Sequence, residues 1–158
     1  MIFNGLIDVM GHKTQQVLEA LDHISSISAV SSLALQPLEN SSHYQMSLGA
    51  LEVKEETQEE AGDTMPATIW IAYIDQDHAI TVADGANRGR EVTYKNIVSA
   101  VEELQVWDGS PLTFTFNPAL EDKHKGFLVF VQSQTTGKIL ASSTLMVRSV
   151  MQSEESES

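Results

Sequence analysis

The residues that could most readily perform chemistry lie close together at positions 75–84. Asp75, Asp77 and His78 stand almost side by side, and Asp84 follows a short apolar run. Carboxylate oxygens and imidazole nitrogens are ligands for divalent cations, so Asp75, Asp77 and His78 are the candidate metal ligands. The competing interpretation is structural, because aspartate is favoured in turns, where its side chain bonds the local backbone.

A second candidate site is the sequence Asp-Gly-Ala-Asn-Arg-Gly-Arg at 84–90. Its glycines permit positive φ, and its backbone amides could surround an anion beside two arginines. We take Asn87, Arg88, Arg90 and the later Asn96 as candidate ligand-binding residues. The stretch matches neither GxGxxG nor GxxxxGK[ST], and no helix is expected after it. A structural loop that carries surface arginines is therefore the alternative.

No arrangement of residues points to a catalytic centre. The histidines are scattered without ligand spacing, no GxSxG elbow occurs, and no serine, histidine and acid follow a recognisable order. The absence of cysteine excludes disulfides, thiolate metal sites and thiol redox chemistry from this chain. The sequence predicts no catalytic residue and no cofactor. An enzyme that uses the 75–90 edge on an anionic ligand, or through a metal, is kept as the alternative.

Length and composition indicate a soluble globular domain. The chain has 158 residues, 42% of them hydrophobic, and its 9 basic and 22 acidic side chains give a net charge of −13. This negative charge argues against nucleic acid or an anionic membrane as a partner. No apolar run approaches the ~20 residues of a membrane span. Residues 1–13 lack the basic and apolar regions of a signal peptide, so none is predicted.

The charge is unevenly spread and divides the chain. Residues 52–63 carry six acids and one lysine, and the end of the chain is acidic as well. Such blocks are typical of solvated segments, so we expect an acidic loop at 52–63 and a disordered tail at 149–158. We expect two structured units. They are residues 1–27 and residues 30–148, and the second contains the acidic loop.

The first unit is predicted to be a short hairpin followed by a helix. Gly5 makes a turn between two extended segments. Apolar residues then recur at Val17, Leu21 and Ile24, which is the spacing of one helix face. An isolated hairpin and so short a helix are marginal in water unless each buries its apolar face. Residues 1–27 must therefore fold back on the sandwich, pair with a second copy of the chain, dock on another protein, or fray. We favour self-association, with another protein as the alternative partner.

Beyond residue 30 the period of the apolar residues changes from about 3.6 to 2, which predicts strands. We expect Thr68–Ile74 and Ala79–Ala83 to form a hairpin. One further strand should run from near Glu91 to about residue 100, although 96–105 also fits a helical stripe, and a helical turn should precede Trp107. The eight expected strands cover residues 33–35, 44–48, 68–74, 79–83, 91–100, 112–116, 127–132 and 139–147.

Many short strands with turn signals between them indicate a mainly β chain, α+β overall. The predicted architecture is an antiparallel, immunoglobulin-like β-sandwich preceded by the hairpin and helix. Trp70, Tyr94 and Phe130 are expected in its core or at its edge. At least one of Gly85 and Gly89 is expected to adopt positive φ in a tight connection outside the sheet.

Residues 65–145 resemble the second half of the bacterial proteins called domain of unknown function 1223. In that family a strand ending in an apolar-aromatic-Asp pattern precedes a Gly-Glu-Asn-x-Gly-Arg turn, a Tyr-x-Asn-Val-Val run and a Leu-Gly-x-Trp-x-Gly ending. The corresponding segments here are Tyr73–Asp75, Gly85–Arg90, Tyr94–Val98 and Leu104–Gly109.

The resemblance also implies where residues 1–27 belong in the family's fold. The first half of the family is thioredoxin-like and carries a CxxC motif, and residues 1–27 are similar to the last hairpin and helix of a thioredoxin fold. This chain has no cysteine, so the family's thiol chemistry is assigned to none of its residues. The resemblance implies an exported protein, and the sequence itself indicates no compartment. The predicted function is a non-catalytic β-sandwich module that binds or supports a partner.

Overall fold

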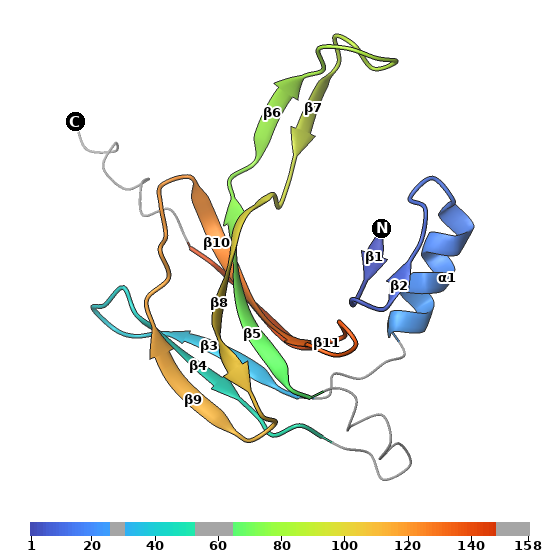
Figure 1. The fold of residues 1–158 in the computed structure, drawn as a ribbon. Coiled ribbons are helices and arrows are strands. Elements are labelled where there is room, and N and C mark those ends of the chain that lie inside the picture. Colours follow the sequence, from blue (N-terminus) through green and yellow to red (C-terminus); the bar gives the residue numbers. More distant parts are fainter. Residues whose placement is uncertain (26–30, 53–64, 148–158) are drawn as a thin grey trace, which may run out of the picture.

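The computed structural model describes residues 1–25, 31–52 and 65–147 (Figure 1). The expected acidic loop at 52–63 and the tail at 149–158 therefore lie almost wholly outside the described residues. The described residues contain no helix long and apolar enough to cross a membrane. Their elements are β1 (Ile2–Phe3), β2 (Ile7–Asp8), α1 (Thr14–Ser25), β3 (Leu33–Pro37), β4 (Tyr44–Leu48), β5 (Ala67–Asp75), β6 (His78–Thr81), β7 (Glu91–Tyr94), β8 (Val98–Trp107), β9 (Leu112–Phe116), β10 (His124–Ser133) and β11 (Ile139–Met146).

Two antiparallel sheets form the body of the molecule. One has the strand order β11-β10-β5-β8 and the other β3-β4-β9. In the lettering of immunoglobulin-like sandwiches, the second sheet corresponds to strands A, B and E, and the first to G, F, C and C′. The expected mainly β, α+β fold is therefore confirmed.

The core lies between the two sheets. Alternate residues of each strand point into it, as in a strand with one face toward a second layer. The fully buried side chains include Ile69 and Ile71 of β5, Phe127 and Val129 of β10, and Met46 of β4. The partner sheet adds aromatic rings, because Phe116 of β9 meets Phe127 edge to face at 5.9 Å between ring centroids.

The expected hairpin between Thr68–Ile74 and Ala79–Ala83 is wrong. β5 pairs with β8 and β10, whereas β6 pairs with β7. The residues of β5 are apolar on both faces, which is typical of a central strand and not of one arm of a hairpin. The turn after β6 brings the chain back onto itself, so β6 finds its partner locally in β7.

The strand after residue 91 also differs from the prediction. The chain bends at Lys95–Ile97, where Asn96 has a φ of 54°, and β8 then runs as a strand to Trp107 with no helical turn. The pairing of β5 with β8 shifts register twice, and Ser99 and Leu104 are the residues without a direct partner. Each such bulge adds one residue to the period of two, so the apolar spacing of β8 imitates a helix.

β6 and β7 form a two-stranded ribbon, residues 78–94, that projects from the body; we call it the arm (Figure 1). Gly85 and Gly89 have φ values of 83° and 79°, which confirms the predicted positive φ. Trp70 and Phe130 face each other across β5 and β10 on the outer surface of the four-stranded sheet, where both are half-buried. Tyr94 is 47% exposed on the arm, so its expected place in the core or at its edge is wrong.

Residues 1–25 form the hairpin β1–β2 and the helix α1, which we call the N-terminal unit. Figure 1 shows this unit and the three-stranded sheet on opposite sides of the four-stranded sheet. The unit is joined to the sandwich by the Ile139 amide, which donates to the Asn4 carbonyl over 3.1 Å. Gly5 lies so close to the Gly137 carbonyl oxygen that a Cβ on Gly5 would stand 2.0 Å from it.

Candidate functional site

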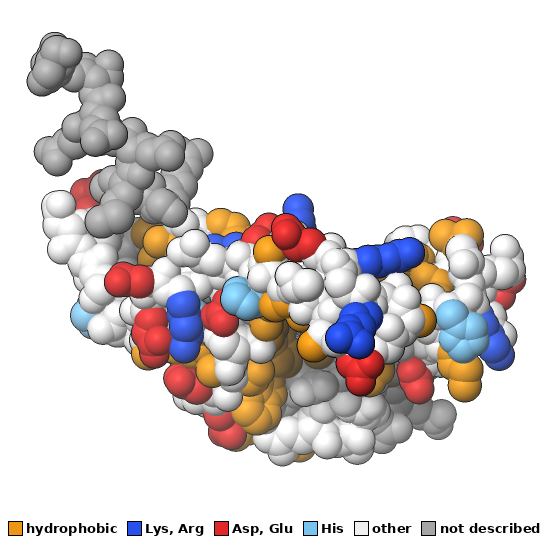
Figure 2. Space-filling view, turned by 90° about the horizontal axis from the view of Figure 1, so that it is seen from above, with side chains coloured by type: hydrophobic (Ala, Val, Ile, Leu, Met, Phe, Trp, Pro, Cys, Tyr) orange, Lys and Arg blue, Asp and Glu red, His pale blue; other side chains and the backbone are white. Residues whose placement is uncertain are grey.

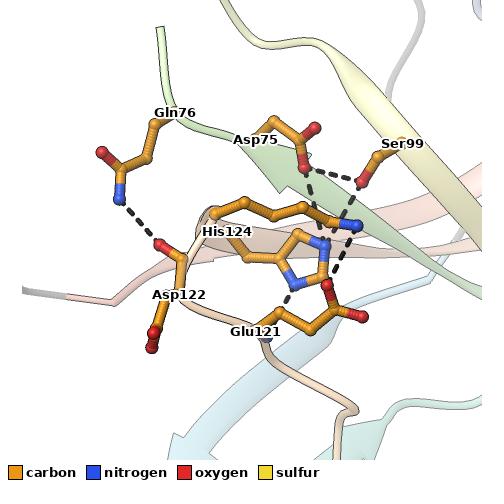
Figure 3. Close-up of polar contacts among 7 residues, drawn as sticks. Asp75, Gln76, Ser99, Glu121, Asp122 and His124 are labelled. Atoms are coloured by element: carbon orange, nitrogen blue, oxygen red, sulfur yellow. Dashed lines mark hydrogen bonds and ion pairs between the residues drawn. The ribbon is translucent and has the colours of Figure 1, made fainter.

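Asp75, Ser99 and His124 meet where the arm leaves the sandwich (Figure 3). The Ser99 hydroxyl donates to Asp75 Oδ1 over 2.7 Å. His124 Nε2 lies 3.3 Å from Ser99 Oγ and 3.6 Å from Asp75 Oδ1. Asp75 ends β5, His124 begins β10, and Ser99 is the bulged residue near the start of β8, so three strands supply one side chain each.

The surroundings of His124 fix its tautomer. Its side chain is only 4% exposed and its ring stacks on that of Tyr73, with 5.1 Å between centroids. The Glu121 backbone N–H donates to His124 Nδ1 over 2.9 Å. Nδ1 is therefore an acceptor, and the neutral imidazole carries its proton on Nε2, facing Ser99 and Asp75.

The three residue types are those of a hydrolytic triad, but their arrangement is different. In a triad the histidine lies between the acid and the serine and takes the serine proton. Here the Ser99 hydroxyl donates a hydrogen bond to Asp75, and His124 presents a proton to the serine, not a lone pair. The network runs in one direction, from His124 through Ser99 to Asp75, and joins three strands. The base beside the hydroxyl is a carboxylate oxygen, not an imidazole nitrogen.

A second polar contact lies on the core side of His124. The Tyr73 hydroxyl accepts from the Ala119 amide over 3.1 Å and donates to Glu102 Oε2 over 3.2 Å. Burial of this hydroxyl is the main cause that raises the pKa of Tyr73 above its usual 10, and the nearby Glu102 carboxylate acts in the same direction. The hydroxyl therefore stays protonated and ties β5 to β8 and to the chain before β10.

The two residues after Asp75 fix the start of the arm. The Gln76 backbone N–H donates to the Lys123 carbonyl, and the Gln76 side chain donates to the Asp122 carbonyl, each over 2.8 Å (Figure 3). Asp77 forms ion pairs with Lys125 and Lys95. The hydrogen bond from Lys125 is the largest cause that holds the pKa of Asp77 below its ordinary value.

The structure directs the three candidate metal ligands to different partners. Asp75 points to Ser99 and His124, Asp77 points to two lysines, and His78 is exposed on β6, opposite Tyr94. Within residues 1–25, 31–52 and 65–147, no group of three or more His, Asp or Glu side chains could hold a metal ion.

The candidate ligand-binding residues are also divided. Asn87, Arg88 and Arg90 lie at the exposed tip of the arm, whereas Asn96 lies in the bend at its base. Several backbone N–H groups of the tip already donate hydrogen bonds within the loop. The Arg88 amide donates to the Gly85 carbonyl, the Gly89 amide to the Val82 carbonyl, and the Arg90 amide to the Asn87 carbonyl. These bonds take three of the donors that a backbone anion site would need.

Sequence reasoning did not identify Ser99 or His124 as site residues. Ser99 lies 24 positions after Asp75 and His124 a further 25, and neither belongs to a spaced motif. Only the pairing of β5 with both β8 and β10 brings them together. The one usable signal was the place of Asp75 at the end of a strongly apolar strand.

Comparison with known proteins supports the fold more than the chemistry. No curated protein matches the chain. A crystal structure of a protein from Agrobacterium tumefaciens, from a structural genomics consortium, superposes with a TM-score of 0.66 at 18% sequence identity. The match covers 96% of this chain but 63% of the Agrobacterium chain, so this chain spans less than two thirds of that protein's length.

The sequence also matches a described protein family over residues 1–132, a range that includes the N-terminal unit. The restriction of the resemblance to the family's second half is therefore not confirmed. The chain belongs to the DUF1223 family of proteins of unknown function.

Proposed function

We propose that this chain is a non-catalytic β-sandwich module that binds or supports a protein partner through its N-terminal unit. The observation that carries the proposal is the apolar surface of that unit. Ile2 is 74% exposed, Leu18 55% and Leu21 47%, while Ala20 is the one residue of α1 that is buried. An amphipathic helix normally buries its apolar stripe, but the described residues leave much of this stripe exposed.

The way the unit is attached supports the same proposal. The backbone hydrogen bond between Asn4 and Ile139 joins the hairpin turn, not the helix, to the sandwich, and the hairpin has two strands only. A two-stranded hairpin and a three-turn helix are marginal in water without a further layer. The similarity of residues 1–27 to the end of a thioredoxin fold points the same way, since such a hairpin and helix would ordinarily pack on further strands.

The polar cluster supports a non-catalytic role. Ser99 donates its proton to Asp75, and His124 Nδ1 is occupied by a backbone amide. In a serine triad a histidine nitrogen accepts the serine proton, and His124 offers Ser99 a proton in place of a lone pair. The cluster instead fixes the base of the arm, which is a structural task.

Sedimentation velocity, combined with urea unfolding, tests the proposal. The variant Leu18→Lys with Leu21→Lys places two charges on the apolar helix face, and Gln15→Lys with Gln16→Lys is the matched control on the same helix. Self-association that the leucine pair abolishes and the glutamine pair retains would identify a second copy as the partner. If the intact chain, both variants and a form lacking residues 1–27 are all monomers with one denaturant midpoint, the unit has no structural partner and the proposal is wrong.

A further inference from the structure

The arm has little support from the rest of the described chain. β6 and β7 contact each other and pack against no other helix or strand of the described residues to a comparable extent. At the tip, a Cβ added to Gly85 or Gly89 would have no atom within 4 Å. A two-stranded ribbon of this length is marginal in water unless its apolar face is covered.

One face of the arm is apolar and aromatic. The register places Ile80 opposite Val92 and His78 opposite Tyr94, and all four share one face because alternate residues of a strand point the same way. Ile80 is 37% exposed and Tyr94 47%. The other face carries small or polar side chains, with Ala79 opposite Thr93 and Thr81 opposite Glu91.

The base of the arm is tied to the body by polar contacts, which restrict the directions that this face can take. Asp75 is bonded to Ser99, and its amide donates to the Ile97 carbonyl over 2.8 Å, which joins the two ends of the arm. Asp77 is bound by lysines from both sides, Lys95 of the bend and Lys125 of β10. A surface that is fixed in advance loses less entropy when it binds.

The charges of the arm favour a second copy as its partner. Residues 78–94 contain two arginines and two acids, 2 − 2, so the arm is neutral in a chain of net charge −13. Two copies can therefore approach through their arms without the repulsion that acts elsewhere. The four charges, Asp84, Arg88, Arg90 and Glu91, all lie near the tip, and Figure 2 shows both signs of charge beside hydrophobic side chains on the side seen from above.

We infer that two copies of this chain associate through the apolar faces of their arms. A two-fold axis between the arms brings together two neutral tips that each carry both signs of charge, so one surface serves both copies. The face consists of four side chains, fewer than the roughly 20–30 residues a side of a standard interface, so we expect a weak dimer with a Kd on the order of 10–100 µM. This inference uses a surface separate from the N-terminal unit and does not depend on the proposed function.

Sedimentation equilibrium on the full chain, from about 10 µM to about 1 mM, measures this association. Tyr94→Lys places a charge on the apolar face, at its base end opposite His78, and is expected to weaken dimerisation about tenfold or more. Thr93→Lys adds the same charge on the opposite face, one residue away, and is expected to leave dimerisation nearly unchanged. Circular dichroism of both variants verifies that the fold is retained.

A charge exchange identifies the arms as the surfaces that meet. Arg88→Glu with Arg90→Glu makes the tip wholly acidic, and Asp84→Arg with Glu91→Arg makes it wholly basic. Each variant alone is expected to dimerise about tenfold or more weakly, because like charges then face each other, whereas an equal mixture forms a heterodimer. Adding Tyr94→Lys to the acidic variant should abolish the heterodimer, which excludes a general attraction between a basic tip and an acidic body.

Three results would overturn the inference. They are a wild-type chain that stays monomeric up to the highest concentration, equal association of the Tyr94→Lys and Thr93→Lys variants, and an equal mixture of tip variants that remains monomeric. The Leu18→Lys, Leu21→Lys variant distinguishes association through the arm from association through the N-terminal unit. It changes only the N-terminal unit, so dimerisation through the arm is expected to remain. Loss of association in that variant alone supports the N-terminal unit and not the arm.

Discussion

Ser99 is exposed on an edge strand, yet its hydroxyl connects Asp75 with His124. It occupies this place because it is the extra residue of a bulge, which turns its side chain out of the regular alternation of β8. A one-residue irregularity in the strand thus creates the polar contact that fixes the arm. The same contact directs the Ser99 proton to a carboxylate, whereas in a serine triad it would point to an imidazole nitrogen.

Asp77 gives a prediction for the pH dependence of stability. The Lys125 hydrogen bond lowers the pKa of Asp77 in the folded chain, so the folded state favours the carboxylate more than the unfolded state does. The contribution of the Asp77 carboxylate to the free energy of unfolding is therefore present above the ordinary aspartate pKa of about 3.9. It is lost as the pH falls through the lower pKa of Asp77 in the folded chain. Asp77→Asn should therefore lower the free energy of unfolding at neutral pH, with a difference from wild type that shrinks on acidification.

Urea unfolding of wild type and Asp77→Asn between about pH 7 and pH 3 measures this difference. Asp22→Asn, on the exposed side of α1, is the control for removing one negative charge from an acidic chain. A difference that stays constant, or grows, as the pH falls would contradict the prediction.

At the scale of elements, the attachment of the N-terminal unit depends on Gly5. Its φ is 70°, and a Cβ there would stand 2.0 Å from the Gly137 carbonyl oxygen. Gly5→Ala combines backbone strain of about 1–2 kcal/mol with this collision, so the hairpin turn should separate from the sandwich. Faster hydrogen exchange of the Ile139 amide, which donates to the Asn4 carbonyl, reports the separation.

Gly85→Ala is the matched control for this prediction. Gly85 has a similar φ of 83°, but a Cβ at this position would have no atom within 4 Å, so alanine there causes strain without a collision. Equal effects of the two substitutions on Ile139 exchange would show that the contact between Gly5 and Gly137 does not hold the unit in place.

Structural features that depend on neighbouring residues can be predicted from the sequence, whereas features that depend on distant residues cannot. The positive φ of Gly85 and Gly89, and the strand character of most of the described elements, depend on neighbouring residues and can be predicted from sequence. Strand pairing depends on distant residues, so sequence reasoning wrongly joins β5 to β6. The bulges at Ser99 and Leu104 disguise β8 as a possible helix. His124 cannot be linked to Asp75 from sequence, because only the completed sheet makes them neighbours.

At the scale of the whole molecule, the sandwich buries its central strands unequally. Apolar side chains of β5 and β10 occupy both faces of the four-stranded sheet, but only one face is covered by β3, β4 and β9. The inner face includes Phe127, which is fully buried, and the outer face includes Phe130, which is half-buried beside Trp70. The same residue type on one strand therefore experiences two environments.

This contrast predicts where the stability of the molecule resides. Phe127→Ala removes a ring enclosed by both sheets, including Tyr44 at 5.0 Å and Phe116 at 5.9 Å between centroids, and should cost about 3–5 kcal/mol. Phe130→Ala removes a ring that water already reaches, and should cost about 1–2 kcal/mol, because less apolar area returns to water and no closed cavity remains. Urea unfolding of the two variants under identical conditions compares the faces directly. Equal losses would mean that a further layer covers the outer face in solution, since only a closed environment on that side would make the two phenylalanines equivalent.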